Sequence, residues 1–236
     1  MNILAPDRPA HVVDLATATL RELNASLHAE ARSPRIGKWR IANPRGQHAI
    51  ACGIDADIEV EIEGHVGYYC AGMNKRATVR VHGNAGPGLA ENVMSGRVVV
   101  DGNASQSAAA TGRGGLVVVY GDASARCGIS MKGVDIVVGG SVGHMSAFMA
   151  QAGHLVILGD AGPALGDSLY EAVLYVRGAI HSLGADARQE PLQDQDCQKI
   201  SELLGKAGIQ ADPQSFKRIA SAKSLYHWNV EANQEY

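Results

Sequence analysis

The sequence has no excess of charge of either sign and no long apolar run. Its 21 basic and 24 acidic residues leave a formal net charge of −3, so no basic surface favours nucleic acid as a partner. No apolar stretch approaches the roughly 18 residues needed to span a membrane. The first residues, MNILAPDRPA, also lack the basic and then apolar layout of a signal peptide. We therefore expect a cytoplasmic protein with neither a membrane nor a nucleic acid as a partner.

Cysteine is scarce, and its spacing argues against two classes of protein. Cys52, Cys70, Cys127 and Cys197 lie far apart, with no C-x-x-C pair. A zinc site or a disulfide framework would need cysteines in closer groups. We expect each of the four to be a buried, unreactive thiol.

Glycine, in contrast, is abundant and recurs at a fixed interval. Seven of the 28 glycines follow one another at a spacing of 19 residues: Gly64, Gly83, Gly102, Gly121, Gly140, Gly159 and Gly178. Such an interval indicates a repeat protein, in which each unit stacks on its neighbours. We expect these seven to be structural turn glycines, at corners that need either a positive φ or a close backbone approach.

The residues before each turn glycine alternate in character. The positions four and two residues before it are aliphatic in all seven repeats, as with Val79 and Val81 before Gly83. The position between them is polar only at first, as Glu61 and Arg80, and apolar in the later repeats. A period of two is typical of a β-strand with one buried face.

A 19-residue unit with one short strand cannot bury its apolar face alone, so copies must stack. The sequence therefore predicts an all-β fold, a right-handed parallel β-helix (solenoid) of about seven 19-residue coils with capping helices at both ends. Neighbouring coils would lie about 4.8 Å apart. Leucine-rich repeats need a leucine ladder that is absent here, hexapeptide helices step in six, and no glycine run completes the dinucleotide-binding pattern G-x-G-x-x-G.

The repeat divides the chain into three segments. We expect an N-terminal helical cap and lead-in at residues 1–44, the glycine-rich β-helix at 45–187 with an irregular first coil, and a C-terminal helical extension at 188–236. Leucines at near-helical spacing predict the first helix within residues 13–31, with Asp14 or Thr17 as its N-cap. In the extension, CQKISELLGKAGI and PQSFKRIASAKSLYHW each indicate a helix.

No group of reactive side chains in the sequence indicates a catalytic site. Asp101 and Tyr120 occupy the same position on neighbouring coils, which provides no carboxylate pair there. Asp122 and Asp160 directly follow turn glycines, where Asp or Asn usually forms local turn hydrogen bonds. The histidines do not share one column, so they indicate no metal ladder. We predict no catalytic, cofactor-binding or metal-binding residue on this chain.

Two surface features remain. Lys75, Arg113 and Lys132 share the column 11 residues after the turn glycine, beside Arg76, and we interpret them as a solvated basic stripe. Two loop segments are unusually apolar and carry aromatic residues and methionines, which are enriched where proteins dock. We predict an interface there, the alternative being that these side chains fold inward and fill the solenoid. The residues are Tyr68, Tyr69, Met73, Met145, Phe148 and Met149.

The glycine motif resembles that of a known family. The pattern G-x-x-G-x-x-x-G is complete at Gly159, Gly162 and Gly166 and partial at Gly83 and Gly86. It resembles the C-terminal GXGXG β-helix domain of the large subunit of glutamate synthase. The stretches NPRGQHAIACGI, EGHVGYYCAGMN and ATGRGGLVVVYGDASARCGISMKG are similar, more specifically, to the free-standing form of that domain, which is the middle subunit of N-methylglutamate synthases.

This resemblance implies a division of labour within a hetero-oligomer. A glutamine-amidotransferase-like subunit and an FMN-binding, iron–sulfur-containing glutamate synthase-like subunit would carry the chemistry, and the β-helix would be their scaffold. The whole complex would convert methylamine and glutamate into N-methylglutamate and ammonia. FMN and the iron–sulfur cluster are expected on a partner subunit.

Two other functions stay open at the level of sequence. Formylmethanofuran dehydrogenase and the related formyltransferase/hydrolase complex also contain a glycine-rich β-helix chain of this superfamily, and that chain is the second hypothesis. A self-sufficient β-helix enzyme acting on carbohydrate is the third. It would need a groove of ordered carboxylates on neighbouring coils.

Overall fold

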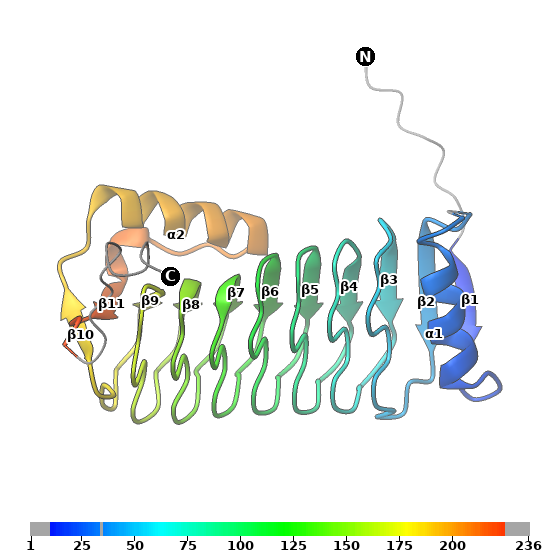
Figure 1. Cartoon of the computed structure of the whole chain (residues 1–236), viewed down its shortest axis with the longest axis horizontal. Coiled ribbons are helices and arrows are strands. Elements are labelled where there is room, and N and C mark those ends of the chain that lie inside the picture. Colours follow the sequence, from blue (N-terminus) through cyan, green and yellow to red (C-terminus); the bar gives the residue numbers. More distant parts are fainter. Residues whose placement is uncertain (1–9, 34, 225–236) are drawn as a thin grey trace, which may run out of the picture.

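The computed structural model describes residues 10–33 and 35–224 and shows an elongated stack of coils (Figure 1). A sheet of 11 strands runs along the stack in the order β1-β2-β3-β4-β5-β6-β7-β8-β9-β11-β10. In the described residues it is accompanied by two α-helices, α1 (Leu20–Ala29) and α2 (Asp194–Ala207), and the 3₁₀-helix η1 (Pro213–Ser215). The strands are β1 (His11–Asp14), β2 (Lys38–Ala42), β3 (Glu59–Ile62), β4 (Thr78–Val81), β5 (Arg97–Val100), β6 (Leu116–Val119), β7 (Lys132–Val138), β8 (Ala152–Ile157), β9 (Val173–Val176), β10 (Ala187–Glu190) and β11 (Lys217–Ser221). The predicted β-solenoid is confirmed.

Strands β3 to β9 pair in parallel with the predicted 19-residue step. Val79 pairs with Val98, for example, and six isolated one-residue bridges repeat the same step on a second face of the coils. The first coil is irregular, as expected, because β2 pairs with β3 through Trp39 and Val60, 21 residues apart. The side chains of the inner columns, such as Val79 and Val98, are 0% exposed and form the core.

The turn glycines are required because consecutive coils approach closely. A Cβ atom on Gly83 would lie 2.7 Å from the carbonyl carbon of Gly64, and one on Gly178 would lie 2.2 Å from the carbonyl oxygen of Gly159. Gly64, with φ of 131°, is the one turn glycine of the seven with a positive φ. Close backbone approach, and not a left-handed backbone, therefore explains the other six.

The left-handed backbone occurs elsewhere in the coil, at residues that are mostly not glycine. In the first regular coil these are Tyr69, Ala71 and Met73, with φ of 63°, 54° and 55°. The N–H groups of Tyr69 and Met73 donate to the following coil, and that of Ala71 donates to the preceding one. These hydrogen bonds hold a conformation that an isolated non-glycine residue adopts only with strain.

Polar side chains after the turn glycines form a ladder between coils. The N–H of Asn103 donates to Asn84 Oδ1 at 2.8 Å, and the N–H of Asp122 donates to Asn103 Oδ1 at 2.8 Å. Further along, Ser141 and Ala179 donate to Asp122 and Asp160 in the same way. The expected local turn hydrogen bonds are therefore replaced by bonds to the next coil.

The predicted N-terminal helix exists but starts later than expected. Thr19 is the N-cap of α1, and it forms a capping box with Glu22. Asp14 and Thr17 are not the cap, because His11–Asp14 forms β1, which pairs in parallel with β2. At this point the residues pair in the sheet, although the leucine spacing predicted a helix.

Helix α1 covers the end of the first coil and satisfies its backbone. The side-chain amide of Asn24 donates to the carbonyl of Ala49 at 2.9 Å and accepts the N–H of Ala51 at 3.0 Å. His28 Nε2 lies 2.7 Å from the carbonyl oxygen of Cys52. These groups would otherwise be an open end of the stack.

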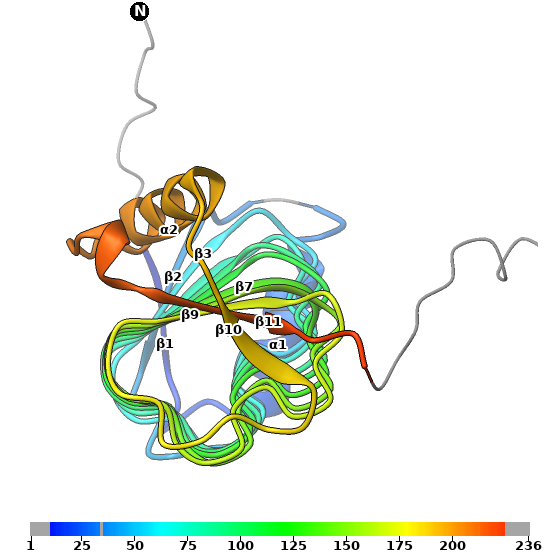
Figure 2. The ribbon, with the colours of Figure 1, turned by 90° about the vertical axis from the view of Figure 1, so that its left-hand side faces the viewer.

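Helix α2 lies along the outer face of the sheet and does not close its end (Figures 1 and 2). Its buried residues Ile200, Leu203 and Leu204 pack with the outward valines of the sheet, among them Val118 and Val137. This helix was predicted, and the apolar outer column of the later coils is the surface that it covers.

The end of the stack is closed by strands. Strand β11 pairs antiparallel with β9, and β10 pairs with β11 (Figure 2). The helix predicted over 213–228 is therefore wrong within the described residues, which form η1 and β11, while residues 225–228 lie outside them. A strand here covers the open edge of β9. Neither described helix is long and apolar enough to cross a membrane.

Candidate functional site

The cysteines form no disulfide with one another. All four are free; Cys70 and Cys127 are buried as expected, whereas Cys52 and Cys197 are only partly buried. Burial raises the pKa of the Cys52 thiol to about 11 and that of Cys127 to about 12. Because the thiolate is the nucleophile and the metal ligand, these side chains are not poised for either role. The described residues also hold no group of three or more His, Cys, Asp or Glu side chains suited to a metal ion.

A charged network that sequence analysis missed crosses the first coils. His82 Nδ1 lies 2.7 Å from Asp101 Oδ2, and its Nε2 contacts Glu61 Oε2. Arg80 pairs with Asp101 at 2.7 Å and lies over the ring of Tyr120. The 19-residue spacing of His82 and Asp101, which places them on neighbouring coils, could have predicted this contact. Both ring nitrogens face carboxylates, so this histidine has no free nitrogen to act on a substrate.

A second polar contact is buried beneath α2. Tyr175 Oη donates to Asp196 Oδ1 at 2.8 Å, and the N–H of Gln193 donates to Asp196 Oδ2 at 2.9 Å. Arg218 Nε also donates to Asp196, at 3.2 Å. Burial and the neighbouring carboxylate raise the pKa of Tyr175. This network joins the sheet to the start of α2 and to β11.

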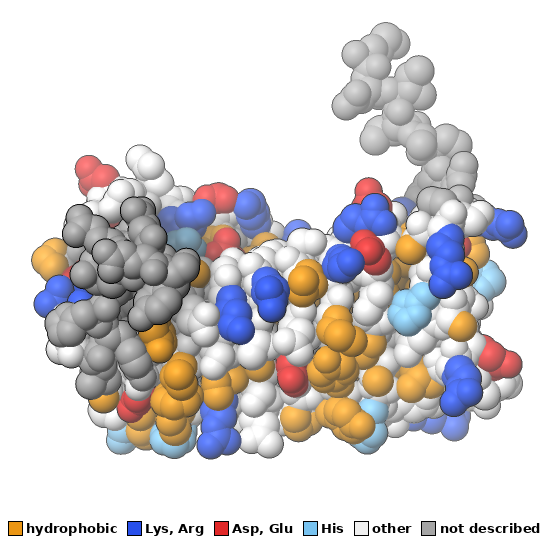
Figure 3. All heavy atoms as spheres, in the orientation of Figure 1, with side chains coloured by type: hydrophobic (Ala, Val, Ile, Leu, Met, Phe, Trp, Pro, Cys, Tyr) orange, Lys and Arg blue, Asp and Glu red, His pale blue; other side chains and the backbone are white. Residues whose placement is uncertain are grey.

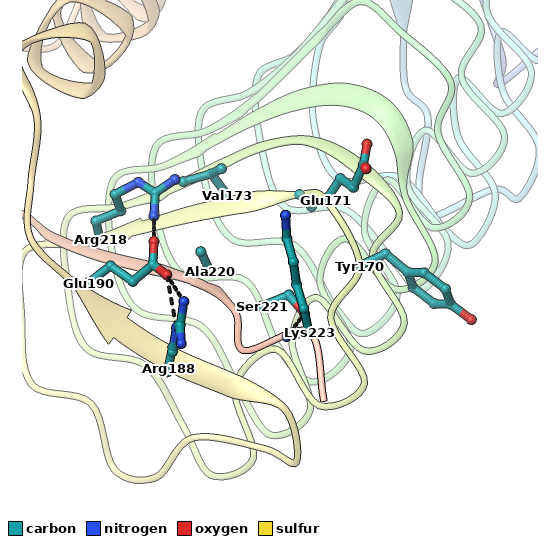
Figure 4. A pocket seen from close by; sticks show the side chains of 10 residues that line it. Tyr170, Glu171, Val173, Arg188, Glu190, Arg218, Ala220, Ser221 and Lys223 are labelled. Carbon is teal, nitrogen blue, oxygen red and sulfur yellow. Dashed lines mark hydrogen bonds and ion pairs between the residues drawn. The ribbon is translucent and has the colours of Figure 1, made fainter. Parts of the chain in front are cut away.

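A pocket of about 340 Å³ opens at the C-terminal end of the stack, between β9, β10 and β11 (Figure 4). Arg188 and Arg218 both pair with Glu190, and the hydrogen bond from Arg188 is the main cause that lowers the pKa of Glu190. Lys223 and Glu171 also line it. The arginines are ion-paired within the pocket wall. The hydroxyl of Ser221, which also lines the pocket, donates to Asp186 Oδ2 and accepts the N–H of Lys223, both at 3.0 Å, so it is engaged in structural hydrogen bonds and we assign the pocket no reaction.

The predicted interface residues form two separate apolar segments. Tyr68 and Met73 are 52% and 47% exposed, and Tyr69 is half-buried. Met145 and Met149 occupy the same columns as Tyr69 and Met73 but four coils further along, which corresponds to about 19 Å. They and Phe148 are half-buried. None of the six is among the fully buried core residues.

The first segment continues onto the next coil. Met94 is 38% exposed, and its N–H donates to the carbonyl of Asn74, the residue after Met73. The ring of Tyr69 covers Gly72, where an added Cβ would lie 2.7 Å from Cε1. We call Tyr68, Tyr69, Met73 and Met94 the apolar patch. Figure 3 shows hydrophobic side chains gathered over the coils of β3 to β5. Met94 was missed because its column otherwise carries cations.

The basic stripe divides into two parts. Lys75 and Arg76 form ion pairs with Asp55, at 2.9 and 3.0 Å. Arg113 and Lys132 are exposed and have no ion pair within the described part of the chain. We call these two residues the basic pair. In Figure 3, basic side chains lie over the coils of β6 and β7, beside the hydrophobic cluster.

Comparisons with known proteins bear on this repeat directly. The family model described as "GXGXG motif" matches residues 35–234, which include every coil of the stack. The chain belongs to the GXGXG-motif family. Protein GlxC of Rhizobium meliloti (strain 1021) is 58% identical over 226 residues, an alignment that covers 95% of this chain and 99% of GlxC. The family resemblance drawn from the glycine motif is confirmed.

As a member of the GXGXG family, the chain uses its glycine motif for stacking. The turn glycines lie against the preceding coil, and the polar side chains after them bond the following one. The apolar patch, the basic pair and the pocket are surface features of the described residues that lie outside this stacking. An exposed patch of aromatic and methionine side chains suits protein contact and not chemistry.

Proposed function

We propose that this chain is the scaffold subunit of an N-methylglutamate synthase. In this role it holds an amidotransferase-like subunit and an FMN-binding, glutamate synthase-like subunit together in a hetero-oligomer. The complex converts methylamine and glutamate into N-methylglutamate and ammonia, and this chain supplies no catalytic group.

The single observation that carries the proposal is the set of hydrogen bonds and ion pairs that the polar side chains of the repeat form. In the GXGXG coils many of them bond the neighbouring coil or each other, as in the ladder from Asn84 to Asp160 and the pairing of His82. A solenoid enzyme acting on carbohydrate needs carboxylates on neighbouring coils that are free to act as acid and base. Here Glu61 and Asp101 are engaged with His82 and Arg80.

The thiol chemistry favours a partner as the holder of the iron–sulfur cluster. Such a cluster is held by about four thiolates in one place. Cys70 and Cys127 are held as thiols by burial, which raises the pKa of each. Under this proposal FMN and the cluster both belong to the glutamate synthase-like subunit.

The test is affinity purification of the tagged full-length chain from the cells that make it. The visible absorption spectrum and subunit masses of the purified material are then measured. We expect flavin and iron–sulfur absorbance together with an amidotransferase-like subunit. A molybdenum or tungsten enzyme, or a zinc amidohydrolase-like partner, would instead point to a formyl-transfer complex, and turnover of carbohydrate by the isolated chain would overturn the scaffold role.

A further inference from the structure

The apolar patch has no cover within the described residues. Tyr68, Met73 and Met94 are three of the four large hydrophobic side chains that are most exposed in this part of the chain. Helix α2 covers the outer face of strands β5 to β9, which is a different face of the coils. Contiguous exposed aromatic and methionine side chains on a folded protein mark a place where another protein docks.

The basic pair lies directly beside this patch on consecutive coils. Met94, Arg113 and Lys132 occupy one column, and their backbones are linked coil to coil: Arg113 N–H donates to Val93 O, and Lys132 N–H donates to Gly112 O, both at 2.7 Å. Their spacing along the stack is therefore about 4.8 Å per coil.

The cations of this column differ in their ion pairing. Lys75, one coil before Met94, is ion-paired with Asp55, whereas Arg113 and Lys132 face solvent with no acidic partner in the described part of the chain. Two unpaired cations beside an apolar centre are complementary to a surface that carries carboxylates beside an apolar centre.

We infer that the apolar patch and the basic pair together form the docking site for a partner protein whose contact face has an apolar centre flanked by carboxylates. This inference rests on the proposed function, because it names the surface through which the scaffold holds one of its partners. The aromatic and methionine side chains supply the buried centre of the interface, and the cations orient the partner along the axis of the stack.

The coils themselves supply substitutions that preserve the fold. Gln106 and Asn92 occupy the columns of Tyr68 and Met73, and Gln151 occupies the column of the basic pair. Asn92 has the same left-handed backbone as Met73, with φ of 56°. The double variants Y68Q/M73N and R113Q/K132Q therefore place residues in environments that the repeat already tolerates. Arg21→Gln, an exposed cation on α1, is the matched control.

Each variant is used in the affinity purification from native cells, with co-purified subunits and flavin absorbance quantified per mole of this chain. We expect Y68Q/M73N to lower, by about tenfold or more, the recovery of at least one partner, as removal of central interface residues does. R113Q/K132Q should lower recovery at low salt and weaken its dependence on salt concentration. Arg21→Gln should change neither, and all variants should keep the wild-type melting temperature.

Two negative results have different meanings. If wild type brings down both partner subunits and the two double variants retain them, the docking site is wrong and the scaffold function stands. If wild type brings down no flavin-containing partner, the proposed function fails and the docking site fails with it.

Discussion

The outer face of the sheet is built in two ways along one repeat. In coils β3 and β4 its outward residues are Glu61 and Arg80, which are partly exposed and belong to a charged network. In coils β5 to β9 the outward residues are apolar and almost fully buried: Val99, Val118, Val137, Val156 and Tyr175. The inner columns do not differ between the two regions.

The polarity of the outward residues therefore depends on whether helix α2 covers them. Where α2 packs, the sheet is apolar on both faces, as in buried parallel sheets. Where α2 stops, the outward side chains become charged. Tyr120 marks the boundary, because its hydroxyl donates to the carbonyl of Ala207 at the end of α2 while Arg80 lies over its ring.

The largest predicted effect is common to both regions. Val81→Asp in an uncovered coil and Val138→Asp in a covered coil each bury an unpaired carboxylate in the core, where both valines are 0% exposed. We expect each to lower the free energy of unfolding by on the order of 5 kcal/mol, enough to unfold the chain. Circular dichroism and thermal melting test this. A native melting temperature for either variant would show that the inner columns are misassigned.

The second-largest predicted loss of stability concerns only the coils that α2 covers. Leu203→Ala removes a fully buried side chain between α2 and the sheet. It should lower the free energy of unfolding by about 2–4 kcal/mol, measured by urea denaturation. Gln198→Ala, an exposed position on the same helix, should be near neutral. Equal effects of the two changes would contradict the packing of α2 on the outer valines.

Replacing a glycine by alanine should have opposite effects on stability in the stacked coils and in helix α2. Gly121→Ala places a Cβ 2.1 Å from Asn103 Oδ1 and 2.8 Å from the carbonyl oxygen of Gly102. We expect it to lower the free energy of unfolding by about 1–3 kcal/mol. Gly205→Ala lies in α2 with nothing within 4 Å and should raise stability by about 0.5–1 kcal/mol. Thermal melting of the two variants should therefore shift in opposite directions, and a shared sign would count against the close approach of coils.

Polar contacts should also differ in strength between the regions. Tyr175→Phe leaves the buried Asp196 without one donor and should cost about 1–3 kcal/mol of unfolding free energy. Glu61→Gln, in the open region, alters a solvent-exposed pair and should cost under about 1 kcal/mol. Chemical denaturation of both variants makes the comparison. If Glu61→Gln were the more damaging, the open network would be holding the coils together.

Most of the solenoid could be predicted because its contacts repeat. Gly83 and Gly102 or Val79 and Val98 are neighbours in space for the same reason that they are 19 residues apart. The apolar outer column from Val99 onward also indicates, from sequence alone, that this face of the sheet is covered.

The ends could not be predicted, because their contacts are not periodic. The pairing of β11 with β9 joins Ile219 to Leu174, and no local pattern signals it. The apolar patch was predicted at Tyr68, Tyr69 and Met73, but Met94 joins it only through the stacking of coils. The ion pairing of the basic stripe could not be predicted either, because it depends on Asp55, whose side chain reaches Lys75 from the preceding coil.

The central proposal is that this GXGXG chain holds the subunits of a complex together and contributes no side chain to the chemistry. An electron cryo-microscopy map of the complex purified with the full-length chain tests it most directly. The account predicts that a partner protein covers the apolar patch and the basic pair, and that no side chain of this chain contacts a cofactor or substrate. A map with a side chain of this chain against the flavin, the iron–sulfur cluster or the bound substrate would contradict it.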